Sequence, residues 1–423
     1  MSSSTERFEK EVPLLRITEE TKQETVDLLQ RLIQIESGNP PGNEDRIAAF
    51  IKAYLSQKGI NVTQLPLEEG RSSLVARIPG KQPGSIVLCG HMDTVNAHEE
   101  KWTVPPFAGQ IEEDRIWGRG SADMKSGVAV ILELAKLITQ NKFTPRKDLA
   151  LVFTADEEQA YRGARSVVQS GLIDDAELLI ITEPTAGQAL PGQKGELWAE
   201  VTFSGKAAHG SVPELGINSI LPASWFCLQL AKAARRFKTI PSRGQTTLNI
   251  GQINGGWQVN VVPDKTRVTL DFRVVSEPEK EQVLDLVQKL GTQAVSQVGA
   301  QFSMKIMSDN PPIISNPDHP HVRDFLNAVN RPAVSSAGLT LASYYTDAGT
   351  IVPALNIPVV IYGPGNISQA HQPDEYLTLD SLYEALDVLA RFLDPENQQE
   401  VGLTVERESM DRAEAPLPQS DLT

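Results

Sequence analysis

The first half of the chain alternates amphipathic segments with short, mainly apolar runs. Apolar residues recur at helical spacing over residues 18–35 and 47–58, which predicts two helices that each turn one face toward a core. Short apolar runs predict strands buried on both faces of a sheet. Such runs cover residues 74–78, 86–89, 149–154, 178–182 and 358–362. Together with helices predicted up to residue 140, over 163–171 and over 380–393, this order is typical of an α/β fold with a mostly parallel sheet.

A different pattern begins at about residue 193. Residues 197–204 alternate apolar and polar side chains, as a half-exposed antiparallel strand does. The elements predicted from there are a strand, a helix, two strands, a helix and a strand. They cover residues 197–204, 218–234, 246–250, 267–275, 279–298 and 301–307. This order predicts a ferredoxin-like α+β module.

The two patterns predict one α/β domain interrupted by an insertion. Residues 1–192 form its first part, residues 193–308 the inserted module, and residues 309–395 its second part. Residues 396–423 are acidic, rich in Gln and Glu and poor in aromatic side chains, so a disordered tail is expected there.

The composition excludes several classes of partner. The formal net charge of the 423 residues is −15, which gives nucleic acid or an anionic membrane surface no electrostatic reason to bind. The sequence has neither an apolar run long enough to span a membrane nor an apolar leader segment, so a cytoplasmic protein is expected. Cys89 and Cys227 fall in different predicted elements and are interpreted as buried structural thiols.

An imidazole and a carboxylate follow the strand predicted at residues 86–89. His91 and Asp93 suit a metal ligand and the acid that orients it, although a histidine in an ordinary turn is the alternative. Glu158, with its neighbour Glu157, follows the strand predicted at residues 149–154.

Three further acid or imidazole groups occur at comparable places. Asp123 precedes a helix, Glu183 follows a strand, and His371 lies beyond the last strand. Each has a structural explanation if taken alone, such as a helix cap for Asp123. Parallel strands end at one edge of a sheet, however, and carboxylates converging there repel one another unless cations neutralise them. A carboxylate and imidazole set without paired cysteines suits Zn²⁺, with Co²⁺ or Mn²⁺ as substitutes.

The motifs around these residues resemble those of the M20 family of zinc amidohydrolases and peptidases. That family includes acetylornithine deacetylases, succinyl-diaminopimelate desuccinylases, aminoacylases and glutamate carboxypeptidases. The resemblance covers residues 25–395 in the family's order. The matching motifs are Gly-His91-Met-Asp93-Thr-Val, Gly118-Arg-Gly-Ser-Ala-Asp123-Met-Lys-Ser-Gly, Thr154-Ala-Asp-Glu157-Glu158, Thr182-Glu183-Pro, Ser204-Gly-Lys-Ala-Ala-His209-Gly-Ser and Ala370-His371-Gln-Pro-Asp-Glu.

The resemblance implies a zinc-exopeptidase-like catalytic domain that holds two Zn²⁺ ions per chain. One ion would take His91, Asp123 and Glu183, and the other would take the same Asp123 with Glu158 and His371. A water molecule between the ions would be the nucleophile.

Two neighbouring residues receive roles from the same resemblance. Glu157 would act as general base and then as general acid, while Asp93 would hold His91. The peptide bond between Asp123 and Met124 would be cis.

The inserted module would, by the same resemblance, act as a lid and join two chains in a homodimer. His209 would enter the partner subunit's site and stabilise the oxyanion, although a surface-loop histidine is the alternative. Asn260 and Arg273 match residues that bind a substrate carboxylate, where a solvated arginine is the alternative. Gly363 and Gly365 would let the backbone approach the substrate closely.

The choice of substrate depends on finer features. Family members with Glu at the position of Glu183 tend to act on N-acyl amino acids or C-terminal amides, and the run around His371 looks most like acetylornithine deacetylases. A deacylase that releases an α-amino acid is therefore the leading hypothesis. A desuccinylase, or a carboxypeptidase or dipeptidase, is the alternative within the family. A non-catalytic dimeric scaffold is the alternative outside it, although no expected ligand is missing.

Overall fold

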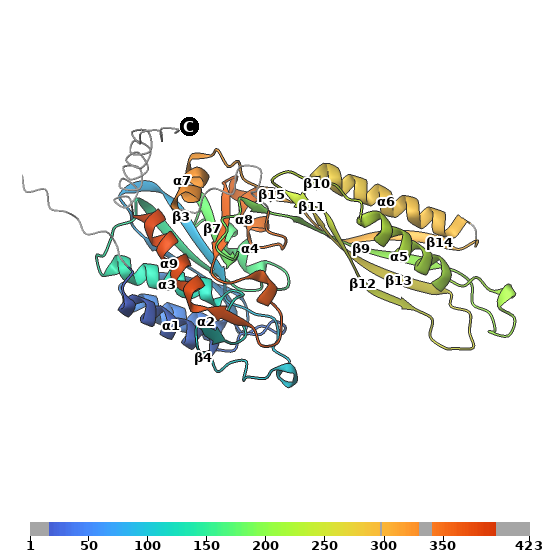
Figure 1. The fold of residues 1–423 in the computed structure, drawn as a ribbon, viewed down its shortest axis with the longest axis horizontal. Coiled ribbons are helices and arrows are strands. Elements are labelled where there is room, and N and C mark those ends of the chain that lie inside the picture. The colour runs from blue at the N-terminus through green and yellow to red at the C-terminus, as the bar shows by residue number, and fades with distance from the viewer. Residues whose placement is uncertain (1–16, 297, 330–340, 395–423) are drawn as a thin grey trace, which may run out of the picture.

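The protein consists of two bodies that lie side by side along its longest axis (Figure 1). A computed structural model describes residues 17–296, 298–329 and 341–394. The larger body contains both ends of the described chain, and the smaller body is the inserted module. The tail expected over residues 396–423 lies outside the described residues. No helix in the described ranges combines the length and apolar character that crossing a bilayer requires.

The larger body is built on a six-stranded sheet. Its strands, in spatial order, are β1 (Val62–Glu68), β2 (Arg71–Ile78), β6 (Lys147–Thr154), β3 (Gln82–His91), β7 (Ala176–Pro184) and β16 (Val359–Gly363). The neighbouring pairs among β6, β3, β7 and β16 are parallel, whereas β2 is antiparallel to both β1 and β6. The mostly parallel α/β sheet expected from the sequence is therefore confirmed.

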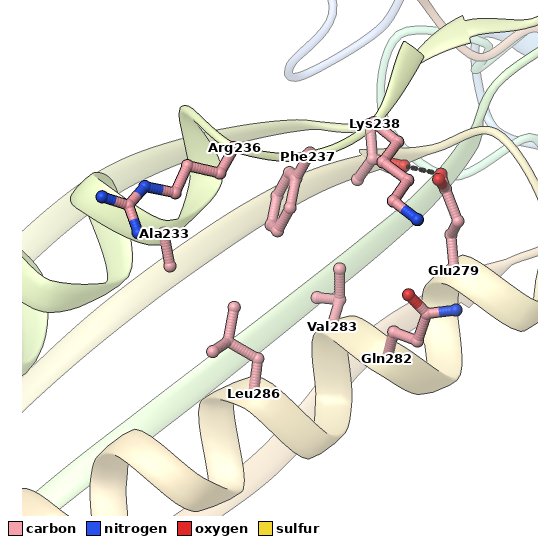
Figure 2. Close-up of a pocket in the computed structure, with 9 residues that line it drawn as sticks. Ala233, Arg236, Phe237, Lys238, Glu279, Gln282, Val283 and Leu286 are labelled. Carbon is pink, nitrogen blue, oxygen red and sulfur yellow. Dashed lines mark hydrogen bonds between the residues drawn. The ribbon is translucent and has the colours of Figure 1, made fainter. Parts of the chain in front are cut away.

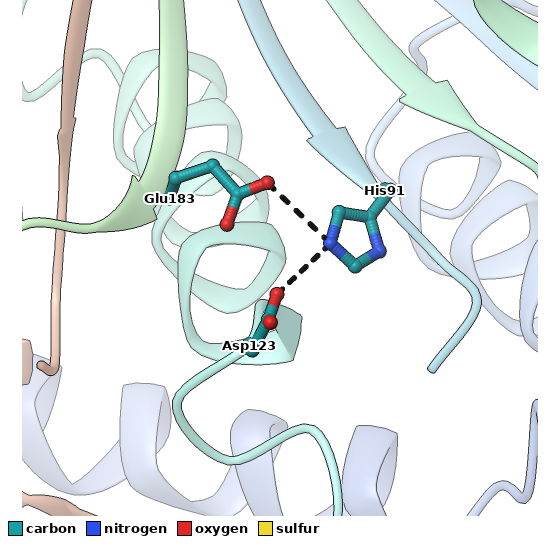
Figure 3. A group of neighbouring side chains, drawn as sticks. All are labelled: His91, Asp123 and Glu183. Atoms are coloured by element: carbon teal, nitrogen blue, oxygen red, sulfur yellow. Dashed lines mark hydrogen bonds and ion pairs between the residues drawn. The ribbon is translucent and has the colours of Figure 1, made fainter. Parts of the chain in front are cut away.

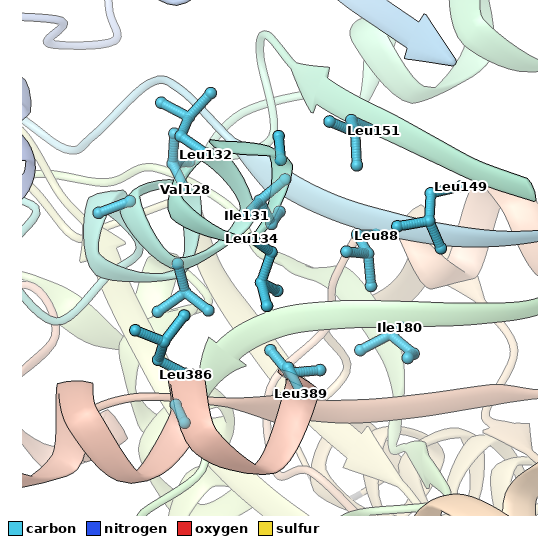
Figure 4. Packing of buried hydrophobic residues seen from close by; sticks show 14 of the residues in the cluster. Leu88, Val128, Ile131, Leu132, Leu134, Leu149, Leu151, Ile180, Leu386 and Leu389 are labelled. Carbon is cyan, nitrogen blue, oxygen red and sulfur yellow. The ribbon is translucent and has the colours of Figure 1, made fainter. Parts of the chain in front are cut away.

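Helices cover both faces of this sheet, which explains why its central strands are continuously apolar. On one face, side chains from α3 (Lys125–Thr139) and α9 (Leu379–Leu393) pack with Leu88 of β3 (Figure 4). Successive residues of a strand point to opposite faces, so Val87 and Cys89 contribute to the other core. The remaining helices are α1 (Glu19–Ile33), α2 (Asp45–Ser56) and α7 (Pro320–Ala328), which share the first core, and α4 (Arg162–Gln169) and α8 (Ala348–Leu355), which share the second.

The inserted module has the ferredoxin-like order that the sequence predicted. Its antiparallel sheet runs, in spatial order, β12 (Thr247–Gly255), β13 (Lys265–Val274), β9 (Gly195–Ser204) and β14 (Gln301–Asn310). Two helices, α5 (Ile220–Ala234) and α6 (Glu277–Ser296), cover one face of this sheet (Figure 1). The outer strands β12 and β14 are sheet edges in the described chain.

Several short elements complete the fold. The segments that connect the two bodies pair through β8 (Gly192–Gln193) and β15 (Ile313–Ile314). A three-stranded sheet joins β4 (Gln110–Glu112), β5 (Arg115–Trp117) and β17 (Tyr376–Thr378), and β10 (Thr239–Ile240) pairs with β11 (Gly244–Gln245). Helix α8 has eight residues and contains Pro353, so its helical pattern is weak. The boundaries of the inserted module stay a prediction.

Candidate metal centre

Acidic and imidazole side chains gather at the carboxyl ends of the parallel strands. Strand β3 ends at His91, β7 carries Glu183 next to its last residue, and Glu157 and Glu158 follow β6. Asp123 lies two residues before α3. The strand ends therefore bring together residues that are far apart in the sequence.

The first group comprises His91, Asp123 and Glu183 (Figure 3). The Nε2 atom of His91 lies 3.1 Å from Asp123 Oδ1 and 3.5 Å from Glu183 Oε1. All three residues are buried. The Nδ1–H of His91 donates to the main-chain carbonyl of Asp93 at 2.8 Å, and this contact turns the Nε2 atom toward the two carboxylates.

The second group comprises Asp123, Glu158 and His371. The Nε2 atom of His371 lies 3.0 Å from Glu158 Oε2 and 3.4 Å from Asp123 Oδ2. Asp123 thus turns one oxygen toward His91 and the other toward His371. Within each group, one ligand atom from every residue lies within 4.8 Å of the others. The donor set fits two divalent cations that share one carboxylate.

The electrostatics of these groups favour cations. Hydrogen bonds with Asp123 and Glu158 raise the pKa of His371 to about 10. Burial lowers the pKa of His91, but Asp123 and the other nearby carboxylates raise it well above its ordinary value. Burial, followed by repulsion from Asp123, raises the pKa of Glu183. Closely packed carboxylates of this kind need protons or metal ions to neutralise them.

Glu157 lies beside both groups and belongs to neither of them. Its side chain is buried, and among the residues that the structure describes its Oε1 atom has no hydrogen-bond partner. Burial raises the pKa of this carboxyl well above its ordinary value. A buried carboxylate oxygen without a partner is suited to accept a proton from a reacting molecule.

Asp93 holds His91 in a different way from the one expected. Its carbonyl oxygen makes the 2.8 Å contact with His91 Nδ1, whereas its carboxylate oxygen Oδ1 lies 3.7 Å from that atom. The carboxylate instead accepts the main-chain N–H groups of Glu157 and Glu158, at 3.1 and 3.2 Å. The peptide bond between Asp123 and Met124 is cis, as the resemblance implied.

Glu375 supports the segment that leads to Asp123, a role that the sequence reasoning missed. Its buried carboxylate accepts hydrogen bonds from the Arg119 guanidinium at 2.6 Å and from the main-chain N–H groups of Gly120, Ala122 and Asp123 at 2.8–3.1 Å. Both Arg119 and Glu375 occur within the motifs quoted above, so their position there was the available signal.

The module residues expected at the site lie elsewhere in this chain. The Nδ1 atom of His209 is 2.8 Å from Ser211 Oγ, and the ring is exposed. Asn260 is a neighbour of His209, because its carbonyl accepts the Gly210 N–H at 2.7 Å. Neither of them belongs to the two metal-binding groups.

Arg273 is held within the module by two carboxylates. Its Nε atom lies 2.9 Å from Asp271 Oδ1, and its Nη1 atom lies 3.2 Å from Glu196 Oε2. The role of Arg273 in binding a substrate carboxylate stays a prediction.

The local backbone explains why glycine occurs at positions 363 and 365. A Cβ atom on Gly363 would lie 2.2 Å from the main-chain oxygen of Thr182, so β16 could not approach β7 with any larger residue there. Gly365 has a φ angle of +88°, which favours glycine. A role in substrate approach stays a prediction for both.

A separate cavity of about 400 Å³ lies in the inserted module (Figure 2). Phe237, Val283 and Leu286 point into it between the end of α5 and the first turns of α6. Its lining contains no residue of either metal-binding group.

The model of peptidase family M20/M25/M40 matches residues 87–394, which include both metal-binding groups. The chain belongs to this family. Its M20 membership means that the protein is a hydrolase of amide bonds, related to metallopeptidases and amidohydrolases.

Curated relatives extend over most of this M20 chain. A probable succinyl-diaminopimelate desuccinylase from Staphylococcus aureus is 29% identical over 402 residues, covering 87% of this chain and 96% of the relative. An acetylornithine deacetylase from Vibrio campbellii is 31% identical over 359 residues, covering 82% and 90%. A dinuclear metal-binding M20 peptidase from Bacillus subtilis shares the fold with a TM-score of 0.67, at 16% identity and covering 89% of this chain and 98% of that one.

Proposed function

We propose that the protein is a two-zinc hydrolase that cleaves the amide bond of an N-acyl amino acid. The observation that supports this proposal is the sharing of Asp123 between two ligand groups, with Glu157 beside them. The Oε1 atom of Glu157 has no hydrogen-bond partner among the described residues. His91, Asp123 and Glu183 would hold one ion, and Asp123, Glu158 and His371 the other. When bound, such a pair of ions acidifies water and polarises the scissile carbonyl.

Glu157 carries the proton transfers in this proposal. Its Oε1 atom accepts a proton from the attacking water and later donates it to the leaving amine. The N–H of Glu157 donates to Asp93, which orients the residue toward the site. Burial excludes competing solvent from the carboxylate.

The substrate class is proposed from the residue type at position 183, and the acyl group from the names of the relatives. Glu183 favours an N-acyl amino acid, and the Vibrio campbellii relative is named an acetylornithine deacetylase. The second candidate is an N-succinyl substrate, which the name of the Staphylococcus aureus relative favours. Both candidates release a free α-amine and a carboxylic acid.

A homodimer through the inserted module completes the proposal. Helix α5 exposes an apolar stripe at helical spacing, with Leu221 63% exposed, Trp225 40% and Leu228 70%. The neighbouring strand β12 is a sheet edge, which is a common surface for pairing with a second chain. In such a dimer the two neighbouring exposed loops, one with His209 and the other with Asn260, would be available to the partner subunit's site.

A substrate panel with the zinc-loaded protein tests this function. We expect release of amine from N-acetyl amino acids or, for the second candidate, from N-succinyl amino acids, and none from either by the Glu157→Gln variant. Cleavage of dipeptides alone would identify the protein as a peptidase of the family and not as a deacylase. No cleavage of any of these amides by a protein that retains two zinc ions would contradict the proposed substrate class.

A further inference from the structure

Behind the turn that carries Glu157 and Glu158 lies a buried polar network. We use this name for Asn39, Glu44, Arg71, Asp93 and Asp156. Each of the five side chains belongs to a residue that is at most 3% exposed. Polar groups buried this deeply are costly unless they are hydrogen-bonded, so their arrangement restricts the backbone around them.

Arg71 is the cation of this network. It comes from the start of β2, and its Nε–H donates to Glu44 Oε2 at 2.8 Å. Its Nη2 atom donates to Glu44 Oε1 at 2.5 Å and to Asp156 Oδ1 at 3.0 Å. One planar guanidinium therefore joins the carboxylate that begins α2 to the residue directly before Glu157. A lysine ammonium has no such fork of donors.

The carboxylates of the network bind the backbone of the turn. The N–H of Asp156 donates to Glu44 Oε1 at 3.1 Å. The next two N–H groups, of Glu157 and Glu158, donate to the two oxygens of Asp93. Three consecutive N–H groups thus donate hydrogen bonds to two buried carboxylates from other parts of the chain.

Asn39 connects the two halves of the network. Its amide donates to Asp93 Oδ2 at 2.9 Å and to Asp156 Oδ1 at 3.1 Å. Asp156 has a φ angle of +65°, a left-handed conformation that non-glycine residues adopt at a cost and retain only where contacts hold them. The network supplies those contacts together with Arg162, a partly exposed residue whose Nε–H donates to Asp156 Oδ2 at 2.6 Å.

We propose that Arg71, acting through Glu44 and Asp156, is a positioning residue for Glu157 and Glu158. The inference rests on the proposed two-metal function and adds a residue to it. Because Glu158 belongs only to the group that contains His371, loosening the turn weakens one of the two metal-binding groups and leaves the group of His91 and Glu183 in place. It also displaces the proton acceptor.

The test compares Arg71→Lys with the matched control Arg77→Lys. Arg77 lies on the same strand and holds Asp175 with two contacts of 2.6 Å, but it makes no contact with the turn. Zinc is titrated into each metal-free protein by calorimetry, without substrate. We expect Arg71→Lys to lower the affinity of one zinc equivalent by about 10–100-fold and to leave the other unchanged, as supporting residues around metal ligands do. The control should keep both equivalents.

Kinetics provide the second readout. On whichever amide the wild type cleaves, kcat of Arg71→Lys should fall at least about tenfold while KM changes little, because a displaced base affects the chemical step. Unchanged zinc affinities, or equal weakening of both equivalents, would overturn the positioning role. If Arg71→Lys does not fold, Asn39→Ala is the second variant, with the same expected loss of one equivalent. Because the titration contains no substrate, failure of the substrate panel and failure of this proposal are distinguishable.

Discussion

At the residue scale, the neighbours Glu157 and Glu158 have separate environments. Glu158 makes a 3.0 Å contact with His371, whereas Glu157 Oε1 has no partner among the described residues. Burial raises the pKa of both carboxyls; the imidazole of His91 opposes that rise for Glu157, and a hydrogen bond with His371 opposes it for Glu158. This difference supports the division of roles between a ligand and a proton acceptor.

Replacing Glu157 with Gln separates these roles experimentally. The change keeps the size of the side chain and removes its ability to accept a proton. We expect kcat to fall by at least about 10²–10⁴-fold, the range for loss of a general base. Zinc content, measured by elemental analysis, should stay at the wild-type value. Retention of more than about a tenth of wild-type kcat would contradict the assignment.

At the element scale, the segment between β5 and α3 depends on one buried ion pair. The carboxylate of Glu375 accepts hydrogen bonds from the Arg119 guanidinium and from three main-chain N–H groups of this segment, the last of them that of Asp123. The pair joins the loop before β17 to the loop before α3. The position of Asp123, the residue common to both groups, is therefore set partly by a residue more than 250 positions away.

Glu375→Gln should destabilise the protein, because it leaves the buried Arg119 cation without its anion. Breaking a buried pair in this way costs about 3–5 kcal/mol of unfolding free energy. Urea unfolding of the metal-free protein measures the change. The double variant Arg119→Met/Glu375→Gln removes the unpaired cation and should recover part of the loss. Equal stability of the single variant and the wild type would show that the loop does not depend on this pair.

Helix α5 is the second feature at this scale. Leu228 lies on its exposed apolar stripe, so Leu228→Glu should place a charge in the proposed dimer interface. Light scattering at micromolar concentration should then give the mass of one chain, where the wild type gives the mass of two. A substitution at the exposed Gln288 of α6, to Glu, is the control and should leave the mass unchanged. A wild-type protein that is monomeric under the same conditions would contradict the dimer.

At the scale of the whole molecule, the expected site residues occupy two bodies. The metal-binding groups lie at the end of the six-stranded sheet, whereas His209 and Asn260 lie in two neighbouring exposed loops of the module. Contacts with Ser211 hold the His209 ring. In the proposed dimer, the partner subunit's site is the one that this ring would reach.

Subunit mixing tests whether His209 acts across the dimer. Loss of one oxyanion donor typically lowers kcat by about 10²–10³-fold, so His209→Ala alone should be strongly impaired with normal zinc content. Mixing it with Glu157→Gln chains, under conditions of subunit exchange, should restore activity, because one site of each mixed dimer then has both residues. A mixture no more active than its parents, once exchange is confirmed, would contradict action across the dimer.

The sequence by itself determined the order of most of the longer elements and which residues are expected as metal ligands. Buried strands are continuous apolar runs and helices repeat at 3.6 residues, so both patterns can be recognised locally. The ligand groups follow strand ends within short motifs, and the parallel arrangement places those ends at one edge. Short elements such as α7 and α8 gave too weak a periodicity to be found.

The tertiary structure alone decided how these residues are held. Arg71 and Asp156 are 85 positions apart, and nothing in the sequence around Arg71 distinguishes it from Arg77, which pairs with Asp175 at the protein surface. The 2.8 Å contact of Asp93 with His91 comes from its carbonyl, whereas the sequence suggested its carboxylate, because the carboxylate accepts N–H groups of the turn after β6. Such contacts join segments that meet only after folding. A buried ion pair leaves no periodic pattern in the sequence, because the packing of the strands determines which charged side chains come together.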